Sequence, residues 1–226
     1  MNTKLELENI SKIYKDGESS IKVLDQVSLQ VKSGELVALV GPSGSGKSTF
    51  LSIAGALLSP SSGRLLIDNI EISKLPPSKL TELRLKKIGF IFQMSNLLPY
   101  LTVKDQLLLI SELAGGRTRI AEKKADELLE RLGLTHRKLN YPENLSGGEK
   151  QRVAIARAFM NDPEVIFADE PTASLDAERG RTVVEMLANE VKERNKAAIM
   201  VTHDKRMLDL CDRVIFIENG RLTESK

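Results

Sequence analysis

The 226-residue sequence has no tryptophan, only three tyrosines and six phenylalanines, and a single cysteine. With Cys211 alone, no intramolecular disulfide can form, which suits a reducing compartment. No run approaches the roughly 18 apolar residues of a membrane span, and the N-terminus lacks the apolar core of a signal peptide. Lys and Arg total 33 against 31 for Asp and Glu, which gives no electrostatic case for nucleic acid binding. We therefore expect a cytosolic protein whose role at a membrane would require a partner.

A glycine-rich loop lies between an apolar run and an apolar helix. Gly41 is followed after four residues by Gly46, Lys47 and Ser48, which fits the phosphate-loop pattern. The residues before the loop predict a buried strand and those after it predict a helix, the order that the motif requires. Successive backbone N–H groups can then face one anion, while Lys47 can reach the outer phosphates and Ser48 can ligate Mg²⁺. The alternative is a loop that only turns the chain. The loop residues expected to contact the nucleotide are Gly41, Pro42, Ser43, Gly44, Ser45, Gly46, Lys47, Ser48 and Thr49.

Three other predicted strands end in polar residues. They are the buried apolar runs 88–92, 164–168 and 197–201. Open α/β sheets bind their ligands at the carboxyl ends of the strands, so these positions favour a site. A loop glutamine and a structural histidine are the alternatives for two of them. The polar residues are Gln93, Asp169 with Glu170, and His203.

The two adjacent acidic residues indicate a bound cation, because neighbouring carboxylates are costly to bring together without one. Asp169 can hold Mg²⁺ through water, and Glu170 can orient or deprotonate an attacking water. His203 could contact the γ-phosphate. Together with Lys47 and Gln93, these side chains fall at one edge of one predicted sheet. Their shared edge favours a common site for ATP and Mg²⁺.

The character of the sequence changes along the chain. Residues 4–9 and 21–32 predict antiparallel strands, the second with a clear alternation of apolar and polar positions. Between residues 94 and 145 we find no convincing strand, and residues 103–113 and 120–132 predict helices. An all-helical block inserted into an α/β chain indicates a subdomain.

A second potential phosphate site precedes the predicted helix 150–160. Ser146 and Glu149 have capping-box spacing, so Ser146 could serve only as a helix cap. However, Gly147 and Gly148 leave this helix N-terminus free of side chains, which exposes backbone N–H groups to an anion. Of the two potential phosphate sites, only the first has a lysine.

The run Leu145-Ser-Gly-Gly-Glu149, continued by residues 151–157 about 100 residues after the phosphate loop, resembles the signature of ABC transporter nucleotide-binding subunits. The resemblance covers essentially all 226 residues. It implies an α/β fold: a P-loop NTPase (RecA-like) core with an N-terminal antiparallel β subdomain and an inserted α-helical signature subdomain. The expected single ATPase domain spans residues 1–226, with the core and the β subdomain in 1–93 and 158–226 and the helical subdomain in 94–157.

The resemblance also implies a role for each polar residue. Gln93 matches the Q-loop glutamine, which contacts Mg²⁺ and senses the transporter. Asp169 and Glu170 match the Walker B aspartate and the catalytic glutamate, and His203 matches the switch histidine. Asp176 matches the D-loop aspartate. Because Glu170 and His203 are both present, each chain is expected to hydrolyse ATP.

Tyr14 lies in a predicted loop near the N-terminus. Its aromatic ring could stack on an adenine, since every base offers a π-face, although spacing alone favours an exposed structural tyrosine. The resemblance favours the first interpretation, because Tyr14 matches the adenine-stacking aromatic of the family.

The resemblance implies a head-to-tail homodimer, which would explain two anion sites in one chain. Ser146, Gly147 and Gly148, with Asp176, would close on the γ-phosphate held by the other copy's phosphate loop. ATP would favour the closed dimer because it binds that state better than the open one. Ser146 can cap its own helix and also contact this phosphate.

Within the family, the sequence resembles the group that includes macrolide exporters and the lipoprotein-releasing and cell-division ATPases. It is most similar to ATPase subunits of bacterial heme exporters, in residues 88–93 with 97–101 and in 158–163 with 168–177. Lipoprotein-releasing members usually have Gly-Asn where this chain has Ala173-Ser174. The group implies an integral membrane permease of the FtsX/MacB-like type, which would hold the subunit at the cytoplasmic face of the membrane. Heme would contact only that permease.

Two other classes of function compete with heme efflux. A soluble ABC ATPase acting on DNA or the ribosome usually carries a long coiled coil or two cassettes, and this chain has neither. A related complex could instead export antimicrobial peptides or lipoproteins, or transmit a mechanical signal without transport.

Overall fold

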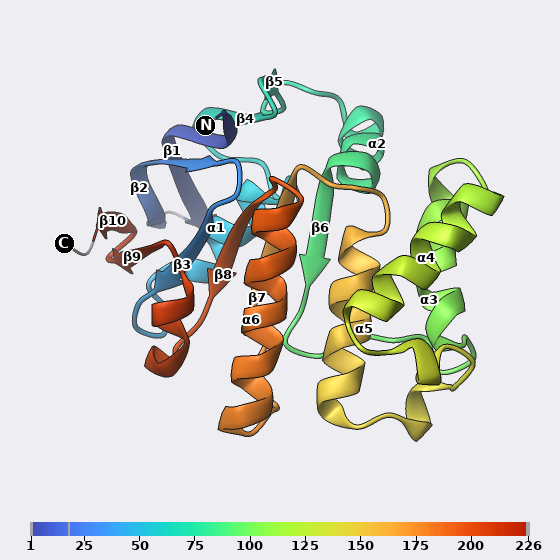
Figure 1. Ribbon diagram of the computed structural model, residues 1–226. Coiled ribbons are helices and arrows are strands. Elements are labelled where there is room, and N and C mark those ends of the chain that lie inside the picture. The colour runs from blue at the N-terminus through green and yellow to red at the C-terminus, as the bar shows by residue number, and fades with distance from the viewer. Residues whose placement is uncertain (1, 18, 225–226) are drawn as a thin grey trace.

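The computed structural model describes residues 2–17 and 19–224, which form two β-sheets with helices around them (Figure 1). The larger sheet has six strands in the order β10-β9-β3-β8-β7-β6, and all but β10 run parallel to their neighbours. The smaller sheet is antiparallel, in the order β2-β1-β4-β5. This α/β architecture agrees with the prediction. The strands are β1 Thr3–Asp16, β2 Ser19–Lys32, β3 Leu36–Val40, β4 Ser62–Ile67, β5 Ile70–Glu71, β6 Ile88–Ile91, β7 Val165–Asp169, β8 Ala197–Val201, β9 Arg213–Glu218 and β10 Arg221–Glu224.

The central strands are apolar on both faces because both faces of the larger sheet are covered. Successive residues of β8 alternate between two separate cores: Ala197 and Ile199 face the first, and Ala198 and Met200 face the second. The first core lies between the two sheets around α1, and the second joins the larger sheet to α3, α4, α5 and α6. The helices are α1 Lys47–Ala54, α2 Pro77–Lys87, α3 Val103–Ala114, α4 Arg119–Arg131, α5 Gly147–Phe159 and α6 Ala177–Glu193, with short 3₁₀ turns at Thr135–Arg137, Pro142–Asn144 and Lys205–Leu210.

The helical block contains the two predicted helices, α3 and α4, which pack on each other and on α5. The predicted subdomain boundary between residues 157 and 158 falls inside α5. This helix contacts β6 as well as α3 and α4, so it connects the block to the larger sheet. None of the helices in the described part of the chain is long and apolar enough to cross a membrane.

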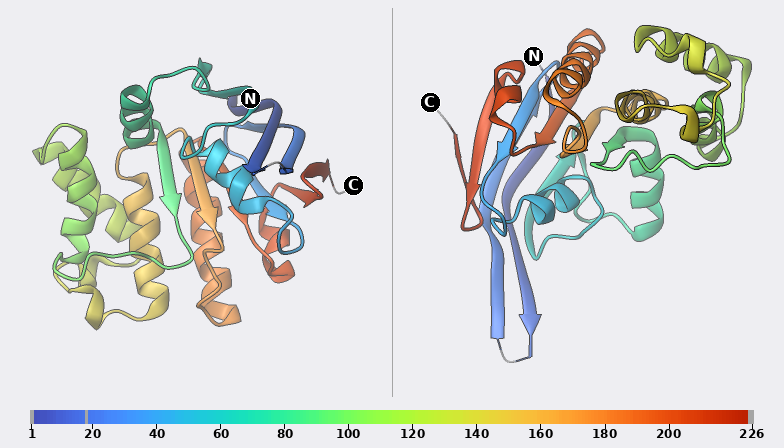
Figure 2. Two further views of the ribbon diagram at one scale, coloured as in Figure 1. Left: turned by 180° about the vertical axis from the view of Figure 1, so that it is seen from behind. Right: turned by 90° about the horizontal axis from the view of Figure 1, so that it is seen from below.

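The β1–β2 hairpin is longer than the sequence predicted and projects from the body of the molecule (Figure 2). The ladder continues outward to the pair Asp16–Ser19. Tyr14, which was expected in a loop, therefore lies in β1 opposite Ile21. Its neighbours gave too weak an alternation of apolar and polar residues to reveal the strand, because both faces of the outer hairpin are solvated.

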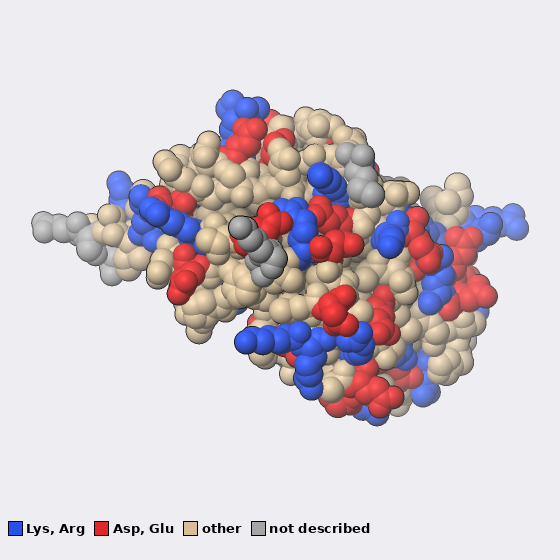
Figure 3. Space-filling view, turned by 60° about the vertical axis from the view of Figure 1, so that its left-hand side comes forward, with Lys and Arg blue, Asp and Glu red and all other residues tan. Residues whose placement is uncertain are grey.

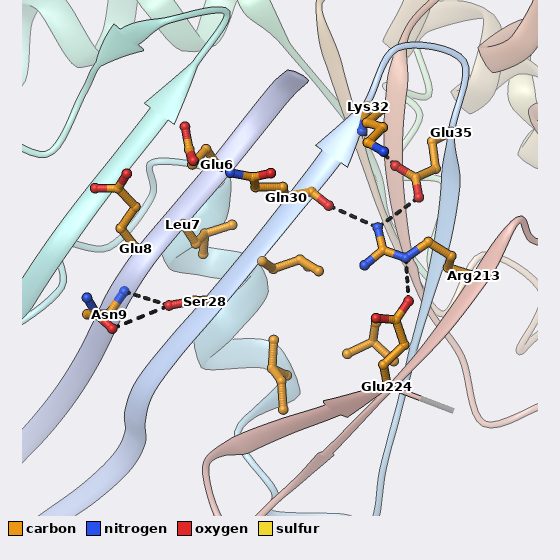
Figure 4. A pocket seen from close by; sticks show the side chains of 13 residues that line it. Glu6, Leu7, Glu8, Asn9, Ser28, Gln30, Lys32, Glu35, Arg213 and Glu224 are labelled. Carbon is orange, nitrogen blue, oxygen red and sulfur yellow. Dashed lines mark hydrogen bonds and ion pairs between the residues drawn. The ribbon is translucent and has the colours of Figure 1, made fainter. Parts of the chain in front are cut away.

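A polar groove of about 860 Å³ lies between β1–β2 and the β9–β10 hairpin (Figure 4). Arg213 crosses it, donating to Glu35 at 2.8 Å, to Glu224 at 2.6 Å and to the Gln30 carbonyl oxygen at 3.0 Å. These carboxylates raise the pKa of Arg213, foremost through the Glu224 hydrogen bond. We assign this cluster to holding the C-terminal hairpin against β2 and the start of β3.

Acidic and basic side chains are interspersed on the face shown in Figure 3. Many form close pairs, such as Arg221 with Asp25 at 2.8 Å. On this face no broad region of one charge is seen, in keeping with the balanced composition.

Candidate nucleotide-binding and catalytic site

The phosphate loop connects β3 to α1 and depends on glycine at both ends. A Cβ atom on Gly41 would lie 2.2 Å from the Ile217 carbonyl oxygen, so β9 leaves no room for a side chain. Gly46 has φ of +104°, and a Cβ atom there would lie 3.0 Å from the Val23 carbonyl oxygen. The loop can take this shape only because these two positions lack a side chain.

The same loop gathers hydrogen-bond donors that fit a phosphate. Gly46 is the N-cap of α1 and supplies no side-chain cap, so the first N–H groups of the helix point out of its end. The Ser45 hydroxyl is buried, and among the described residues it has no hydrogen-bond partner. Lys47 begins α1, and its side chain reaches back to the loop, where Nζ donates to the carbonyl oxygens of Gly41 and Pro42, each at 2.8 Å. An anion would satisfy the helix N-terminus and Ser45 together.

The parallel strands bring the predicted catalytic residues to one edge. Lys47 follows β3, His203 follows β8 and Glu170 follows β7, and these three strands are adjacent in the sheet. The Glu170 carboxylate lies 2.5 Å from His203 Nδ1. The Glu170 backbone is left-handed, with φ of +49°, and its N–H donates to the Val201 carbonyl oxygen at 3.0 Å. Backbone strain at such a position is typical of functional sites.

Asp169 and Gln93 complete this edge at β7 and β6. Burial raises the pKa of the Asp169 carboxyl, and the positive charge of Lys47 opposes that rise. A partly buried carboxylate is stabilised by a cation. No cluster of three or more His, Cys, Asp or Glu suited to a metal occurs in residues 2–17 and 19–224. Mg²⁺ does not need one, because in phosphate sites it takes one or two protein ligands and completes its shell with phosphate oxygens and water. Ser48 and Gln93 as direct ligands, with Asp169 acting through a bound water, would fit that requirement.

The second glycine-rich helix start is capped by its own side chains. Ser146 Oγ accepts from the Glu149 N–H at 3.3 Å, and the Ser146 N–H donates to Glu149 at 2.8 Å, which completes the expected capping box. Arg137 donates to the other Glu149 oxygen at 2.8 Å. Burial raises the pKa of Glu149, but the Ser146 backbone and the Arg137 guanidinium outweigh it and lower that pKa to about 2.

Asp176 lies beside this helix start and caps α6, accepting from the Arg179 N–H at 3.0 Å. A Cβ atom on Gly147 would lie 3.3 Å from Leu175, the residue before Asp176. α1 packs in the core on one face of the larger sheet and α5 in the core on the other. Ser146, Gly147, Gly148 and Asp176 thus form a group separate from the phosphate loop of their own chain.

The sequence did not reveal the residues that hold the segment around Gln93. Gln151 is buried in α5 and donates to the Phe92 carbonyl oxygen at 3.0 Å. Arg157, on the same helix, donates to the carbonyl oxygens of Ser95 at 2.8 Å and Asn96 at 2.9 Å. Their only signal is that they are polar residues of a helix with a buried apolar face, which cannot identify backbone partners in a distant loop. Through them, the helix that begins at Gly147 positions Gln93.

Comparison with known proteins agrees with this arrangement. Residues 24–173 match the family described as ABC transporter. The chain belongs to the ABC transporter family. Two solved structures of the ATP-binding cassette MJ0796 resemble it with a TM-score of 0.86 and 40% identity, over 98% of both chains. One of them is a dimer in a post-hydrolysis state with ADP and phosphate.

Curated relatives match this ABC cassette over nearly its whole length. A protein of Staphylococcus haemolyticus is 50% identical over 218 residues, covering 96% of this chain and 98% of the relative. One of Staphylococcus saprophyticus is 49% identical over 221 residues, covering 98% and 99%. Both are provisionally named hemin import ATP-binding protein HrtA. The resemblance of the sequence to ABC transporter nucleotide-binding subunits is confirmed. The chain is an ATP-hydrolysing cassette of an ABC transporter.

Proposed function

We propose that this cassette works as a head-to-tail homodimer at the cytoplasmic face of the membrane and powers heme efflux through an FtsX/MacB-like permease. The observation that carries the substrate is the near-full-length identity with relatives named for hemin. Their names give import as the direction, whereas the resemblance to macrolide and lipoprotein exporters favours efflux. Heme itself would contact the permease alone. Within the cassette, His203 is paired with Glu170 and His136 is exposed.

ATP hydrolysis would be carried out by the residues that gather at the carboxyl ends of the strands of the larger sheet. Lys47 and the N–H groups at the start of α1 bind the phosphates. Mg²⁺, held by Ser48, Gln93 and Asp169, would neutralise charge on the phosphate oxygens when bound. Glu170 accepts a proton from the attacking water, and the contact with His203 fixes its orientation. The homodimer is supported by the dimeric structures of the similar cassette.

A groove beside the Gln93 segment supports contact with a permease. It has a volume of about 420 Å³ and lies between α2, β6, α3 and α5. Phe90 and Phe92 stack in its wall with ring centroids 5.6 Å apart, and Phe92 is 38% exposed. Exposed aromatic side chains are typical anchors at protein interfaces. Since Phe92 precedes Gln93, a permease helix in this groove would move a residue of the nucleotide site.

The test is ATPase activity of the full-length chain with its permease in lipid vesicles, with and without low-micromolar hemin. We expect hemin to stimulate the activity, and ATP on the cassette side to move hemin away from that side. The complex with Glu170→Gln serves as the inactive control. An ATPase activity that does not respond to hemin would contradict heme as the substrate but would leave the assignment as an ATPase intact. ATP-driven movement of hemin toward the cassette side would show import instead of efflux.

A further inference from the structure

The Tyr14 ring lies on the projecting part of the β1–β2 hairpin. Tyr14 is 42% exposed and its cross-strand partner, Ile21, is 58% exposed. Directly paired side chains lie on the same face of a sheet. The hairpin thus presents a flat ring beside an aliphatic side chain, and a nucleobase can stack on such a surface.

Lys12 holds this ring from one side. It lies two residues before Tyr14 in β1, so both side chains lie on one face of the strand. Lys12 Nζ is 5.3 Å from the centre of the Tyr14 ring, within the range of a cation–π interaction. The same Nζ donates to the Ser59 carbonyl oxygen at 2.8 Å. With its ammonium held by the ring and by the Ser59 carbonyl oxygen, Lys12 restrains the ring on one face, and the exposed part of the ring remains for a ligand.

The surface is also fixed relative to the phosphate loop. Between the pairs Lys12–Leu24 and Ile13–Lys22 the register shifts, which leaves Val23 as an extra residue in β2. The Val23 carbonyl oxygen faces Gly46 at the start of α1, where even a Cβ atom would come within 3.0 Å of it. Ser59 follows the other end of the same helix. The hairpin therefore contacts the start of α1, the helix that carries Lys47, and the segment that follows this helix.

We propose that Lys12 is a positioning residue for the base of the nucleotide. It holds Tyr14 as a stacking surface at a set place relative to the phosphate loop, and Ile21 extends that surface. The cassette then binds a nucleoside triphosphate better than a bare triphosphate, and Lys12 contributes to that preference. This inference rests on the proposed binding of phosphates at Lys47.

Isothermal titration calorimetry on the full-length chain tests it, with MgATP and magnesium tripolyphosphate as ligands. Lys12→Met keeps the side chain's length and removes its charge. We expect ATP affinity to fall about two- to fivefold, the worth of an exposed cation–π contact, with tripolyphosphate affinity unchanged. Lys12→Arg should restore ATP binding, because arginine is also a cation and a donor. The control is Lys15→Met, an exposed lysine on the same hairpin, which should bind both ligands normally.

Equal losses for the two ligands in Lys12→Met would overturn the proposal, since they would show a general effect on the phosphate site. Unchanged ATP affinity would also overturn it. If the wild-type chain bound neither ligand, the proposed function itself would fail. Tyr14→Trp gives an independent readout, because it introduces the only tryptophan of the chain. Its fluorescence should change with ATP and not with tripolyphosphate, and adding Lys12→Met should reduce the change. A response to both ligands alike would argue against stacking.

Discussion

The two glycine-rich helix starts of this cassette differ in how their backbone donors are satisfied. α1 begins after Gly46 with no side-chain cap and no acidic residue in its first turn, and it carries Lys47. α5 begins after Ser146 with a complete capping box and Glu149 in its first turn. The first start leaves its donors for a ligand, whereas the second is ordered by its own side chains.

The difference leads us to expect that only the α1 start binds a free phosphate. Glu149 stays ionised down to pH values near 2, so its negative charge lies in the first turn of α5 at physiological pH. A free anion would meet that charge with no lysine at the helix start, since the Arg137 guanidinium is already paired with Glu149. A phosphate already held by Lys47 of a second copy would arrive with part of its charge offset. The α5 start thus suits an anion shared between two chains.

The largest expected effect comes from Glu170→Gln. Removing the proposed base should slow hydrolysis by about 10²–10⁴ and leave ATP binding intact. Because the bound ATP is not hydrolysed, the α1 start of one chain and the α5 start of the other should both stay in contact with its phosphates. The variant should therefore elute as a dimer in ATP and as a monomer without it. Size-exclusion chromatography and steady-state ATPase assays measure these outcomes. Hydrolysis at the wild-type rate would show that Glu170 is not the base.

Ser146→Arg distinguishes the contribution of the α5 start to dimer formation from that of the α1 start to ATP binding. In the Glu170→Gln background, an arginine at the α5 start should fill the place of the shared phosphate and prevent the dimer. ATP affinity of the monomer should stay within about twofold, because distant sites couple by only ~0.5 kcal/mol. The matched control is Ser43→Arg in the phosphate loop, which should lower ATP affinity itself. A stable ATP dimer of the Ser146→Arg variant would contradict the head-to-tail arrangement.

Low pH should reduce the stability of the folded chain by protonating Glu149 at the start of α5. Its pKa falls from the usual 4.5 to about 2 in the folded chain, so its contribution to stability is complete above pH 4.5 and is lost as the pH falls toward 2. A displacement of this size corresponds to about 3 kcal/mol. Glu149→Gln should therefore destabilise the chain at pH 7, and the difference from wild type should shrink below pH 4. Urea unfolding at several pH values measures the free energy of unfolding of both proteins. A difference between them that did not depend on pH would show that the Glu149 charge is not the cause.

The sequence predicted the chemistry of this cassette better than its geometry. The strands that lead to Lys47, Gln93, Asp169 and His203 were predictable, because buried parallel strands appear as uninterrupted apolar runs. The parallel order then brings their ends together. The partners of Gln151 and Arg157 were not predictable, since both bind backbone carbonyls, which no residue pattern encodes.

The outer hairpin was missed for a different reason. A strand that is solvated on both faces needs no periodic pattern, so Tyr14 was expected in a loop although it lies in β1. Its role in stacking is a prediction that Tyr14→Trp tests, as Ser146→Arg and Glu170→Gln test the roles predicted for those two residues.

The smallest expected effect distinguishes the glycines of the two starts. Gly46→Ala would place a side chain at φ of +104° and within 3.0 Å of the Val23 carbonyl oxygen, which belongs to backbone and cannot rotate away. Strained positions of this kind cost about 1–3 kcal/mol, and for a chain of this size each kcal/mol lowers the melting temperature by about 2–4 °C.

Gly147→Ala is the matched control at the other start. Its added carbon would meet only Leu175 Cδ2 at 3.3 Å, the end of a side chain that can shift, and its backbone is an ordinary first turn of a helix. We expect its melting temperature to stay within about 2 °C of wild type, since such substitutions change stability by ~0.5 kcal/mol. Differential scanning calorimetry without nucleotide measures both variants. Equal melting temperatures would mean that the hairpin yields at Val23, and the α1 start would then be no more constrained than the α5 start.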